Sequence, residues 1–406
     1  MTMRWLMGLA ANSRGDKVAA ALIETKGLGI DLEIRPIRVL RQSYPRDVRD
    51  VLAQIRANRT ADLRQLTILH RVIGESFAAI AQQLAAEAGF PLQRILCLGL
   101  ETQTMWREVE GRYPSILPLG LAAAVAEQTG VTTVSSFAAR DLAAGGQGTG
   151  ITDLADFIFY RQSGENQLII HLGEVVRLVL LPASARPRDI RGFEAGPCNI
   201  LLDGLIASVT KGKESFDPGG RYAVQGKCDD SLLARWLGHP HYAKRPPKSV
   251  PRPDFGREFV EQALQLARQE QISIHDVLCT ATHLVARGVT DAVNRFVAGP
   301  LHPVRVLVGG GGARNGFLLH LIQQGLVDRP LESLERSGFP ADGHQALAAA
   351  LLAALALDGV AANLPGSTGA RAGRVLGSIT PGSPANWARC IAWMAGQMTQ
   401  DLALAG

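Results

Sequence analysis

The stretch VLVGGGGARNG, residues 306–316, carries the pattern that decides the fold. Apolar residues typical of a buried strand run into four consecutive glycines, and a helix-like segment follows. Glycine has no Cβ, so the backbone of such a turn can approach a ligand closely, and a helix start offers free N–H groups. The stretch matches neither a Rossmann fingerprint nor a P-loop. It predicts a strand–turn–helix unit, which is either a ligand-binding turn or an ordinary connection with one useful glycine.

Outward from this unit, strand and helix patterns alternate twice along the chain. RWLMGLAAN and KVAAALIET predict two strands joined by the polar turn NSRGDK, and NQLIIHLGEVVRLVLLP predicts strands of a second sheet. HQALAAALLAALALDGV predicts an alanine-rich helix, and HYAKRPPKSVPRPDFGRE a long loop. With 406 residues, the chain exceeds the usual size of one compact core. We therefore expect an α/β protein with two mixed sheets facing a cleft.

Composition excludes several other classes. The chain is 47% apolar and 19% charged, as in folded soluble proteins. It has no apolar run long enough for a membrane span and no convincing signal peptide, so a cytoplasmic protein without a membrane partner is expected. The net charge of +5 comes from dispersed basic residues, which argues against nucleic-acid binding. Five scattered cysteines without a CxxC pair indicate neither a zinc site nor a disulfide framework.

Two short motifs contain residue types that suit catalysis. In GFEAGPCN, residues 192–199, the carboxylate of Glu194 lies between glycines and a proline, which predicts a rigidly held acidic group. In NSRGDK, Asn12 and Ser13 could bind phosphate and Asp16 could hold Mg²⁺, although a solvated hairpin tip is the more common structure. The helical histidines His283 and His344 are expected to be ordinary surface or core residues.

Taken in order, the motifs resemble those of anhydro-N-acetylmuramic acid kinases, which are two-domain sugar kinases of the actin/hexokinase-like (ribonuclease H-like) fold with an interdomain cleft. The resemblance covers nearly the whole chain, from about residue 8 to 381. The matching segments are GLAANSRGDKVAAAL, RDLAAGGQG, GFEAGPCNILLDG, FDPGGRYAVQGK, LLARWLGHPHYAKRPPKS, GGGARN and NLPGSTGARAGRVLG.

The resemblance implies a reaction and a set of roles. Such enzymes use ATP, Mg²⁺ and water to open the 1,6-anhydro ring of an amino sugar released in cell-wall recycling, and they phosphorylate O6. Glu194 would be the base and Asp16 the metal ligand, directly or through water. The residues implied for ATP and its phosphates are Asn12, Ser13, Arg14, Gly15, Asp16, Lys17, Val18, Ala19, Gly173, Gly310, Gly311, Gly312 and Asn315. The residues implied for the sugar are Gln103, Thr104, Arg140, Asp141 and Lys248.

The resemblance also implies a division of the chain. Residues 1–135 and 357–406 would form the N-terminal lobe, and residues 136–356 the C-terminal lobe with the catalytic loop and the glycine run. Whether the chain forms a homodimer is left open.

Several positions depart from the family's pattern. Glu194 replaces the usual aspartate, Asn12 replaces a glycine, and Glu174 would place a carboxylate beside the nucleotide phosphates, where like charges repel unless an arginine such as Arg14 neutralises it. The segment VPRPDF, residues 250–255, interrupts the usual continuation after PPKS. Two functions are therefore predicted as alternatives: a kinase of this family with weak or altered activity, or a catalytically inactive relative that serves as a sugar or nucleotide sensor or as an interaction scaffold.

Overall fold

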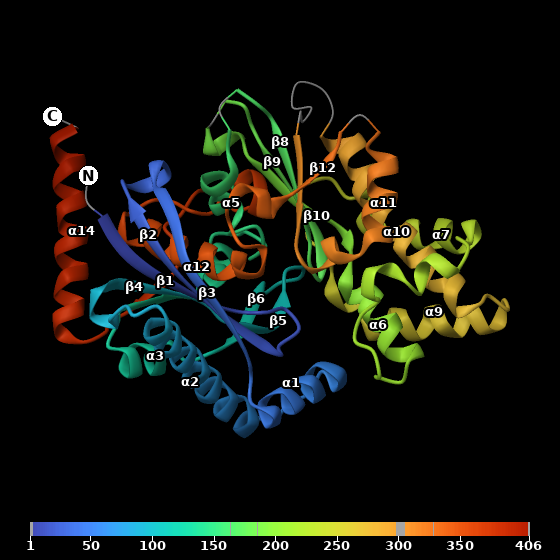
Figure 1. The fold of residues 1–406 in the computed structure, drawn as a ribbon, viewed down its shortest axis with the longest axis horizontal. Coiled ribbons are helices and arrows are strands. Elements are labelled where there is room, and N and C mark those ends of the chain that lie inside the picture. Colours follow the sequence, from blue (N-terminus) through green and yellow to red (C-terminus); the bar gives the residue numbers. More distant parts are fainter. Residues whose placement is uncertain (1–2, 163, 185, 298–304, 328, 405–406) are drawn as a thin grey trace. The chain divides into compact units, whose positions relative to one another are not determined.

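The chain divides into two compact units in its computed structural model (Figure 1). The structure describes residues 3–162, 164–184, 186–297, 305–327 and 329–404. The first unit comprises residues 1–160 and 342–406, and the second comprises residues 161–341. The second unit is thus inserted into the chain of the first.

The first unit is built on a six-stranded mixed sheet with the order β13-β7-β4-β1-β2-β3. Strands β1, β2 and β3 form an antiparallel meander, and β4 and β7 add in parallel on the other side of β1. The strand β13 closes that edge in antiparallel orientation. The strands are β1 (Met3–Ala11), β2 (Lys17–Lys26), β3 (Glu33–Ser43), β4 (Ile95–Glu101), β7 (Thr133–Ser135) and β13 (Ser378–Thr380).

Helices cover both faces of this sheet. Side chains alternate along a strand, so Met7 and Leu9 of β1 pack in one core with α2, while Gly8 faces α12. The helices of the unit are α1 (Arg46–Asn58), α2 (Leu63–Glu87), α3 (Ala122–Thr129), α4 (Phe137–Ala143), α5 (Asp153–Tyr160), α12 (His344–Leu357), α13 (Pro365–Thr368) and α14 (Pro384–Leu404). A hairpin of β5 (Gln103–Glu108) and β6 (Ser115–Leu119) stands beside the main sheet.

Helix α12 packs on the sheet at unusually short range. A Cβ added to Gly8 would lie 1.7 Å from the carbonyl oxygen of Ala346, and one added to Gly99 would lie 1.9 Å from that of Ala349. The helix is alanine-rich and buried around most of its circumference. Small residues on both elements therefore allow backbone-to-backbone packing that larger side chains would prevent.

The second unit repeats the same topology in a five-stranded sheet of order β10-β9-β8-β11-β12. Strands β8, β9 and β10 form an antiparallel meander, and β11 and β12 add in parallel beside β8. The strands are β8 (Gln167–Leu172), β9 (Val175–Leu181), β10 (Arg191–Pro197), β11 (Arg305–Gly309) and β12 (Leu331–Ser333).

Helix α10 is the longest helix of the second unit and contributes much of its apolar core. Residues of α6, α7, α9 and α11 join it in one buried cluster. The helices are α6 (Asn199–Val209), α7 (Asp230–Leu237), α8 (Pro240–Ala243), α9 (Arg257–Gln269), α10 (Ile274–Phe296) and α11 (Gly316–Gly325). The segment predicted as a long loop contains α8 and a short 3-10 helix at Arg252–Phe255.

The predicted α/β class with two mixed sheets is confirmed. The predicted boundaries at 135/136 and 356/357 differ from the observed division, because α4 and α5 precede the chain crossing and α12 packs on the first sheet. No helix among the described residues is both long enough and apolar enough to cross a membrane.

Candidate functional site

Glu194 lies on β10 at an irregular point of the strand. The pairing with β9 shifts register between Glu194 and Gly196, which is a bulge of the kind that redirects side chains near functional sites. The backbone N–H of Glu194 donates to the carbonyl of Lys248 at 3.0 Å, and its carbonyl lies 3.1 Å from Nε2 of His241. Only 3% of Glu194 is exposed. The rigid frame predicted for this carboxylate is thus built from β9 and the segment around Lys248.

The carboxylate of Glu194 is paired with Arg252. Nη1 of Arg252 donates to Oε2 at 2.7 Å and Nη2 donates to Oε1 at 3.0 Å, while the backbone N–H of Val250 donates to Oε2 at 2.7 Å. A two-pronged guanidinium–carboxylate contact is among the strongest polar interactions in proteins. The carboxylate of Glu194 is therefore held as one member of a largely buried ion pair.

Arg252 comes from the segment that interrupts the family pattern. Its short 3-10 helix, Arg252–Phe255, is anchored by Phe255, which is fully buried and packs with Val175 and Val250 in a small apolar cluster. Nε of Arg252 also lies 3.8 Å from Oε2 of Glu174. An arginine partner for Glu174 was predicted, and within the second unit Arg252 fills that role. One guanidinium therefore faces both carboxylates.

His241 and Lys248 complete the surroundings of β10. His241 is fully buried, and burial, with a further contribution from Lys248, lowers its pKa to about 4. The ring is neutral at physiological pH. Nζ of Lys248 donates to the carbonyl of His241 at 3.0 Å. The sugar contact implied for Lys248 stays a prediction.

The loop between β1 and β2 in the first unit is closed by Asn12. Its Oδ1 accepts from the backbone N–H groups of Asp16 and Lys17, both at 3.1 Å, and its Nδ2 donates to the carboxylate of Asp16. Gly15 adopts a φ of 71°, which favours glycine. The side chain of Asn12 thus occupies two backbone amides of the turn, a contact that a glycine at this position could not make.

Other residues of this loop remain accessible. Ser13 and Arg14 are exposed, and Asp16 is half-buried. Lys17, Val18 and Ala19 already belong to β2, where Lys17 is exposed and Val18 is buried. A carboxylate and a hydroxyl are oxygen ligands of the type that Mg²⁺ prefers. The chemistry of Asp16 therefore fits the metal ligand predicted there, and the hydroxyl of Ser13 stays a predicted phosphate contact.

The glycine run after β11 is required largely by packing within the second unit. Gly310 has a φ of 90°, and a Cβ there would lie 2.6 Å from the carbonyl oxygen of Leu172. A Cβ on Gly312 would lie 2.8 Å from the side chain of Leu172, whereas Gly311 is exposed and its Cβ direction is open to 3.5 Å. Asn315 caps α11 by accepting from Leu318 N–H at 3.0 Å. Gly311 is thus the member of the run best placed to approach a ligand.

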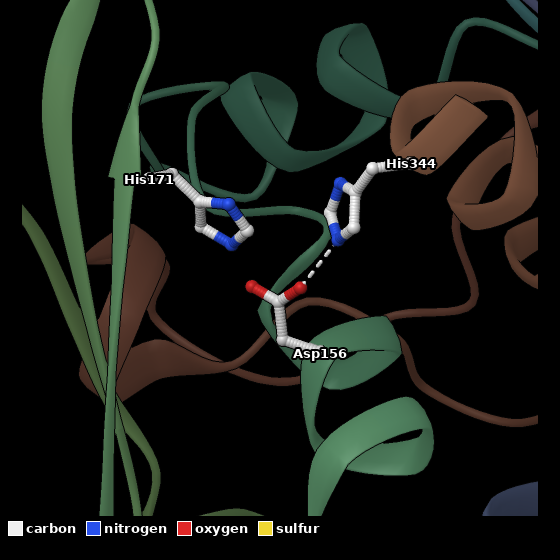
Figure 2. A group of neighbouring side chains, drawn as sticks. All are labelled: Asp156, His171 and His344. Carbon is white, nitrogen blue, oxygen red and sulfur yellow. Dashed lines mark hydrogen bonds and ion pairs between the residues drawn. The ribbon is translucent and has the colours of Figure 1, made fainter. Parts of the chain in front are cut away.

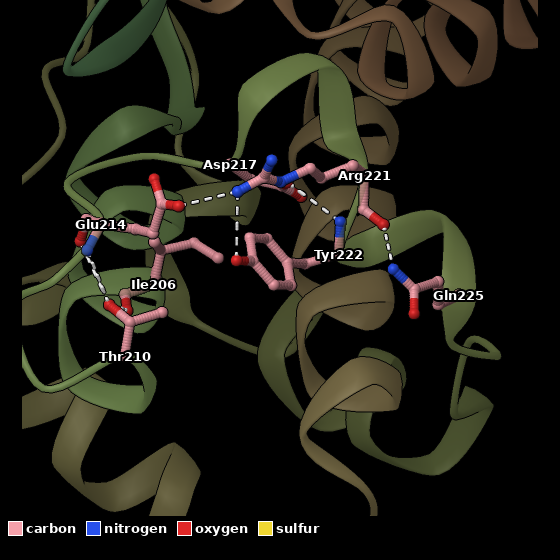
Figure 3. A network of polar contacts seen from close by, with 7 residues as sticks. All are labelled: Ile206, Thr210, Glu214, Asp217, Arg221, Tyr222 and Gln225. Carbon is pink, nitrogen blue, oxygen red and sulfur yellow. Dashed lines mark hydrogen bonds and ion pairs between the residues drawn. The ribbon is translucent and has the colours of Figure 1, made fainter.

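The motif FDPGGRYAVQGK packs beside this cap. Gly220 adopts a φ of 84°, and a Cβ there would lie 2.5 Å from Oδ1 of Asn315. Figure 3 shows part of the polar network that holds the motif: Asp217 accepts from the backbone N–H of Tyr222, and Arg221 pairs with Glu214 at 2.7 Å. Asp217 also accepts from the backbone N–H of Ala223. Asp217 was not among the predicted site residues, and its buried role here is to shape the turn.

The remaining predicted sugar residues lie in the first unit. Asp141 on α4 is fully buried, and its two oxygens accept from Gly148 N–H and from Nδ2 of Asn363, both at 2.9 Å. Its carboxylate therefore closes the glycine-rich loop. Gln103 on β5 is 2% exposed, and its Oε1 lacks a hydrogen-bond donor among the described residues. Arg140 is exposed and Thr104 half-buried; the sugar contacts of all four stay predictions.

His344, at the start of α12, pairs with Asp156 of α5. The two side chains meet at 2.6 Å, and Asp156 is fully buried (Figure 2). The ring of Tyr160 stacks on His344 with an interplanar angle of 9°. This pair fastens α12 to α5 inside the first unit; His171, also drawn, belongs to β8 of the second unit.

Two sheets of one topology, each with a tight polar turn between its first two strands, define a two-unit α/β protein of the actin/hexokinase-like class. The chain belongs to the anhydro-N-acetylmuramic acid kinase family, whose model matches residues 4–382.

Curated members of the family align over almost their full length. Proteins with that name from Gloeobacter violaceus and Salinibacter ruber are each 33% identical, over 92% and 94% of this chain and 98% and 97% of their own. Solved structures are more distant. The chain resembles the ADPNP-bound activator of a 2-hydroxyisocaproyl-CoA dehydratase from Clostridium difficile with a TM-score of 0.43 at 14% identity, covering 86% of this chain and 94% of that one.

Proposed function

We propose that this chain is an ATP-dependent kinase that opens the anhydro ring of anhydro-N-acetylmuramic acid with water and phosphorylates the sugar at O6. The observation that supports this proposal most directly is family membership over residues 4–382, with an acidic residue kept on a bulged strand at the catalytic position. The name that these relatives share indicates the substrate.

The proposed reaction forms one new bond at the anomeric carbon of the sugar and one at its O6. A water oxygen attacks the anomeric carbon, its proton passes to the carboxylate of Glu194, and the bond from that carbon to O6 breaks. O6 then attacks the γ-phosphorus of ATP, and ADP leaves. The protein has little covalent work to do, so positioning and charge stabilisation supply most of the catalysis.

The roles of the other residues follow from the surfaces they offer. In the first unit, Ser13 and the exposed cations Arg14 and Lys17 would contact the phosphates, and Asp16 would hold Mg²⁺, which supplies neutralising charge when bound. Gln103 would contact the sugar, because a donor from a sugar hydroxyl would satisfy its buried Oε1. In the second unit, Gly311 would allow the nucleoside close to the backbone.

A second candidate function is favoured by one specific contact. A water molecule activated by Glu194 competes with Arg252 for the same carboxylate, and Arg252 bonds both of its oxygens. If the pair does not yield during turnover, the chain is a family member that binds ligand without catalysis. Whether the Glu194–Arg252 ion pair opens during turnover therefore distinguishes a slow kinase from a sensor or scaffold.

The test is a direct assay with Mg-ATP and the anhydro sugar. We expect ADP together with a product that has gained one water and one phosphoryl group, and ¹⁸O-labelled water should place its label on the anomeric carbon. Thermal melting with and without Mg-ATP is measured in parallel, since ligand at 100 times its Kd adds ~2.7 kcal/mol. A melting shift without product would favour the sensor. The absence of both a melting shift and product would contradict the kinase proposal.

A further inference from the structure

A cavity of about 220 Å³ lies behind the strand that carries Glu194. Ala195 of β10 and several residues of helix α10 line it. The cavity is lined entirely by the second unit, so its geometry does not depend on the first. The lining of the cavity includes Tyr242, Lys248, Asp291, Arg295 and Phe296.

Two cations converge on one aromatic ring in this cavity. Nζ of Lys248 lies 5.4 Å from the ring centroid of Phe296, and the guanidinium carbon of Arg295 lies 5.0 Å from the same centroid. Lys248 is 5% exposed, so its ammonium group is largely removed from water. Nη1 of Arg295 donates to the carbonyl of Tyr242 at 3.0 Å, which fixes the guanidinium near the cavity.

Neither cation is balanced by a carboxylate. In the described part of the chain, no acidic side chain forms an ion pair with Lys248 or Arg295. The carboxylate at the cavity wall, Asp291, instead lies 3.4 Å from Arg287. Burial, with further contributions from Arg295 and Lys244, lowers the pKa of Lys248 to about 8, and no opposing charge raises it. A buried, uncompensated ammonium is costly, and a bound anion would remove that cost.

The third polar group of the cavity is the hydroxyl of Tyr242. The hydroxyl of Tyr242 is buried and makes no hydrogen bond among the described residues. The Tyr242 ring lies close to Gly196, where a Cβ would be 3.2 Å from the phenol oxygen, and to Gly288, so it cannot move readily toward another acceptor. Buried hydroxyls are normally satisfied, and an oxyanion would accept from this one.

We propose that this cavity binds a small oxyanion of phosphate or carboxylate type, through Lys248, Arg295 and the Tyr242 hydroxyl. Phe296 supplies an apolar surface that both cations contact. This assignment gives Lys248 a role other than the sugar contact predicted for it, and it does not depend on the kinase proposal. The backbone carbonyl of Lys248 also accepts a hydrogen bond from the backbone N–H of Glu194. The residue that binds the anion would therefore contact the strand of Glu194 directly.

The experiment is isothermal titration calorimetry of the full chain with inorganic phosphate and, separately, lactate, at ionic strength held constant with chloride. We expect saturable binding of at least one of them. The ligand that binds more tightly shows whether the cavity recognises a phosphate or a carboxylate. Lys248→Met and Arg295→Gln should each weaken binding about tenfold or more, because hydrogen bonds to charged groups contribute ~1.5–3 kcal/mol. Arg268→Gln, an exposed cation on α9, is the matched control and should bind as the wild type does.

Tyr242→Phe keeps the ring and removes only the hydroxyl, so this variant should fold and still test the site if the other two variants do not fold. It should weaken binding several-fold while the circular dichroism spectrum stays unchanged. Absence of saturable binding by the wild type at tens of millimolar of either anion would overturn the proposal. Unchanged affinity in Lys248→Met, Arg295→Gln and Tyr242→Phe would also overturn it, because the anion would then bind elsewhere, for example at the phosphate loops.

Discussion

Replacing Arg252 with methionine tests the central contact of the candidate site. The substitution keeps much of the side-chain volume but leaves the carboxylate of Glu194, 3% exposed, without its guanidinium. Removing one partner of a buried ion pair costs ~3–5 kcal/mol. The Arg252 side chain is 28% exposed, so we expect the lower end of that range. For a unit of ~150–250 residues, each kcal/mol lowers Tm by ~2–4 °C, so ~3 kcal/mol predicts a loss of ~6–12 °C.

The assay is thermal and urea unfolding of the wild type, Arg252→Met, Glu194→Gln and the double variant. A double-mutant cycle then isolates the coupling between the two side chains. Arg235→Met is the matched control, because Arg235 pairs with Glu270 at 3.2 Å on the surface of the same unit. Exposed pairs contribute ~0.2–1 kcal/mol. A loss for Arg252→Met no larger than that of the control would refute the conclusion that the pair anchors Glu194.

Three further predictions concern catalysis, pH and packing. Glu194→Gln should abolish product formation but keep the Mg-ATP melting shift, and turnover by this variant would contradict its role as the base. Burial raises the pKa of Glu101 to about 7, so its protonated form favours the folded state: stability should fall as pH rises from about 4.5 to 7, and Glu101→Gln should flatten that part of a plot of Tm against pH. Gly8→Ala forces a Cβ against the backbone of Ala346 and should cost at least ~1–3 kcal/mol in urea unfolding, whereas Gly396→Ala, on the exposed face of α14, should cost nothing and gain up to ~1 kcal/mol.

Patterns that are local in sequence predicted most of the architecture. The apolar run before the glycines at residues 309–312 forms β11, and the alanine-rich segment forms α12, because strand and helix periodicity depend on neighbouring residues. The domain boundaries were placed less well. Helix α12 is preceded and followed by ordinary turn residues. Its packing against Gly8 and Gly99 and its pairing with α5 assign it to the first unit.

Pairings between distant residues could not be predicted. Arg252 and Glu194 are 58 positions apart, and VPRPDF was recognised as a departure without any sign of which carboxylate its arginine would meet. The hydrogen bond that the carboxylate of Asp141 accepts from Asn363, which is 222 positions away, had no signal in the sequence either. Amino-acid type indicates that a charge is present, whereas its partner is set by the tertiary fold.

The insertion of the second unit into the chain of the first has a consequence for synthesis on the ribosome. The strands bearing Gly8 and Gly99 are translated long before His344, where α12 begins. At ~5–20 residues per second, that interval lasts on the order of tens of seconds. Throughout it, the nascent first unit lacks the helix that covers one face of its sheet, while residues 161–341 emerge as a continuous unit. We expect the inserted unit to mature first and chaperones to meet the uncovered sheet.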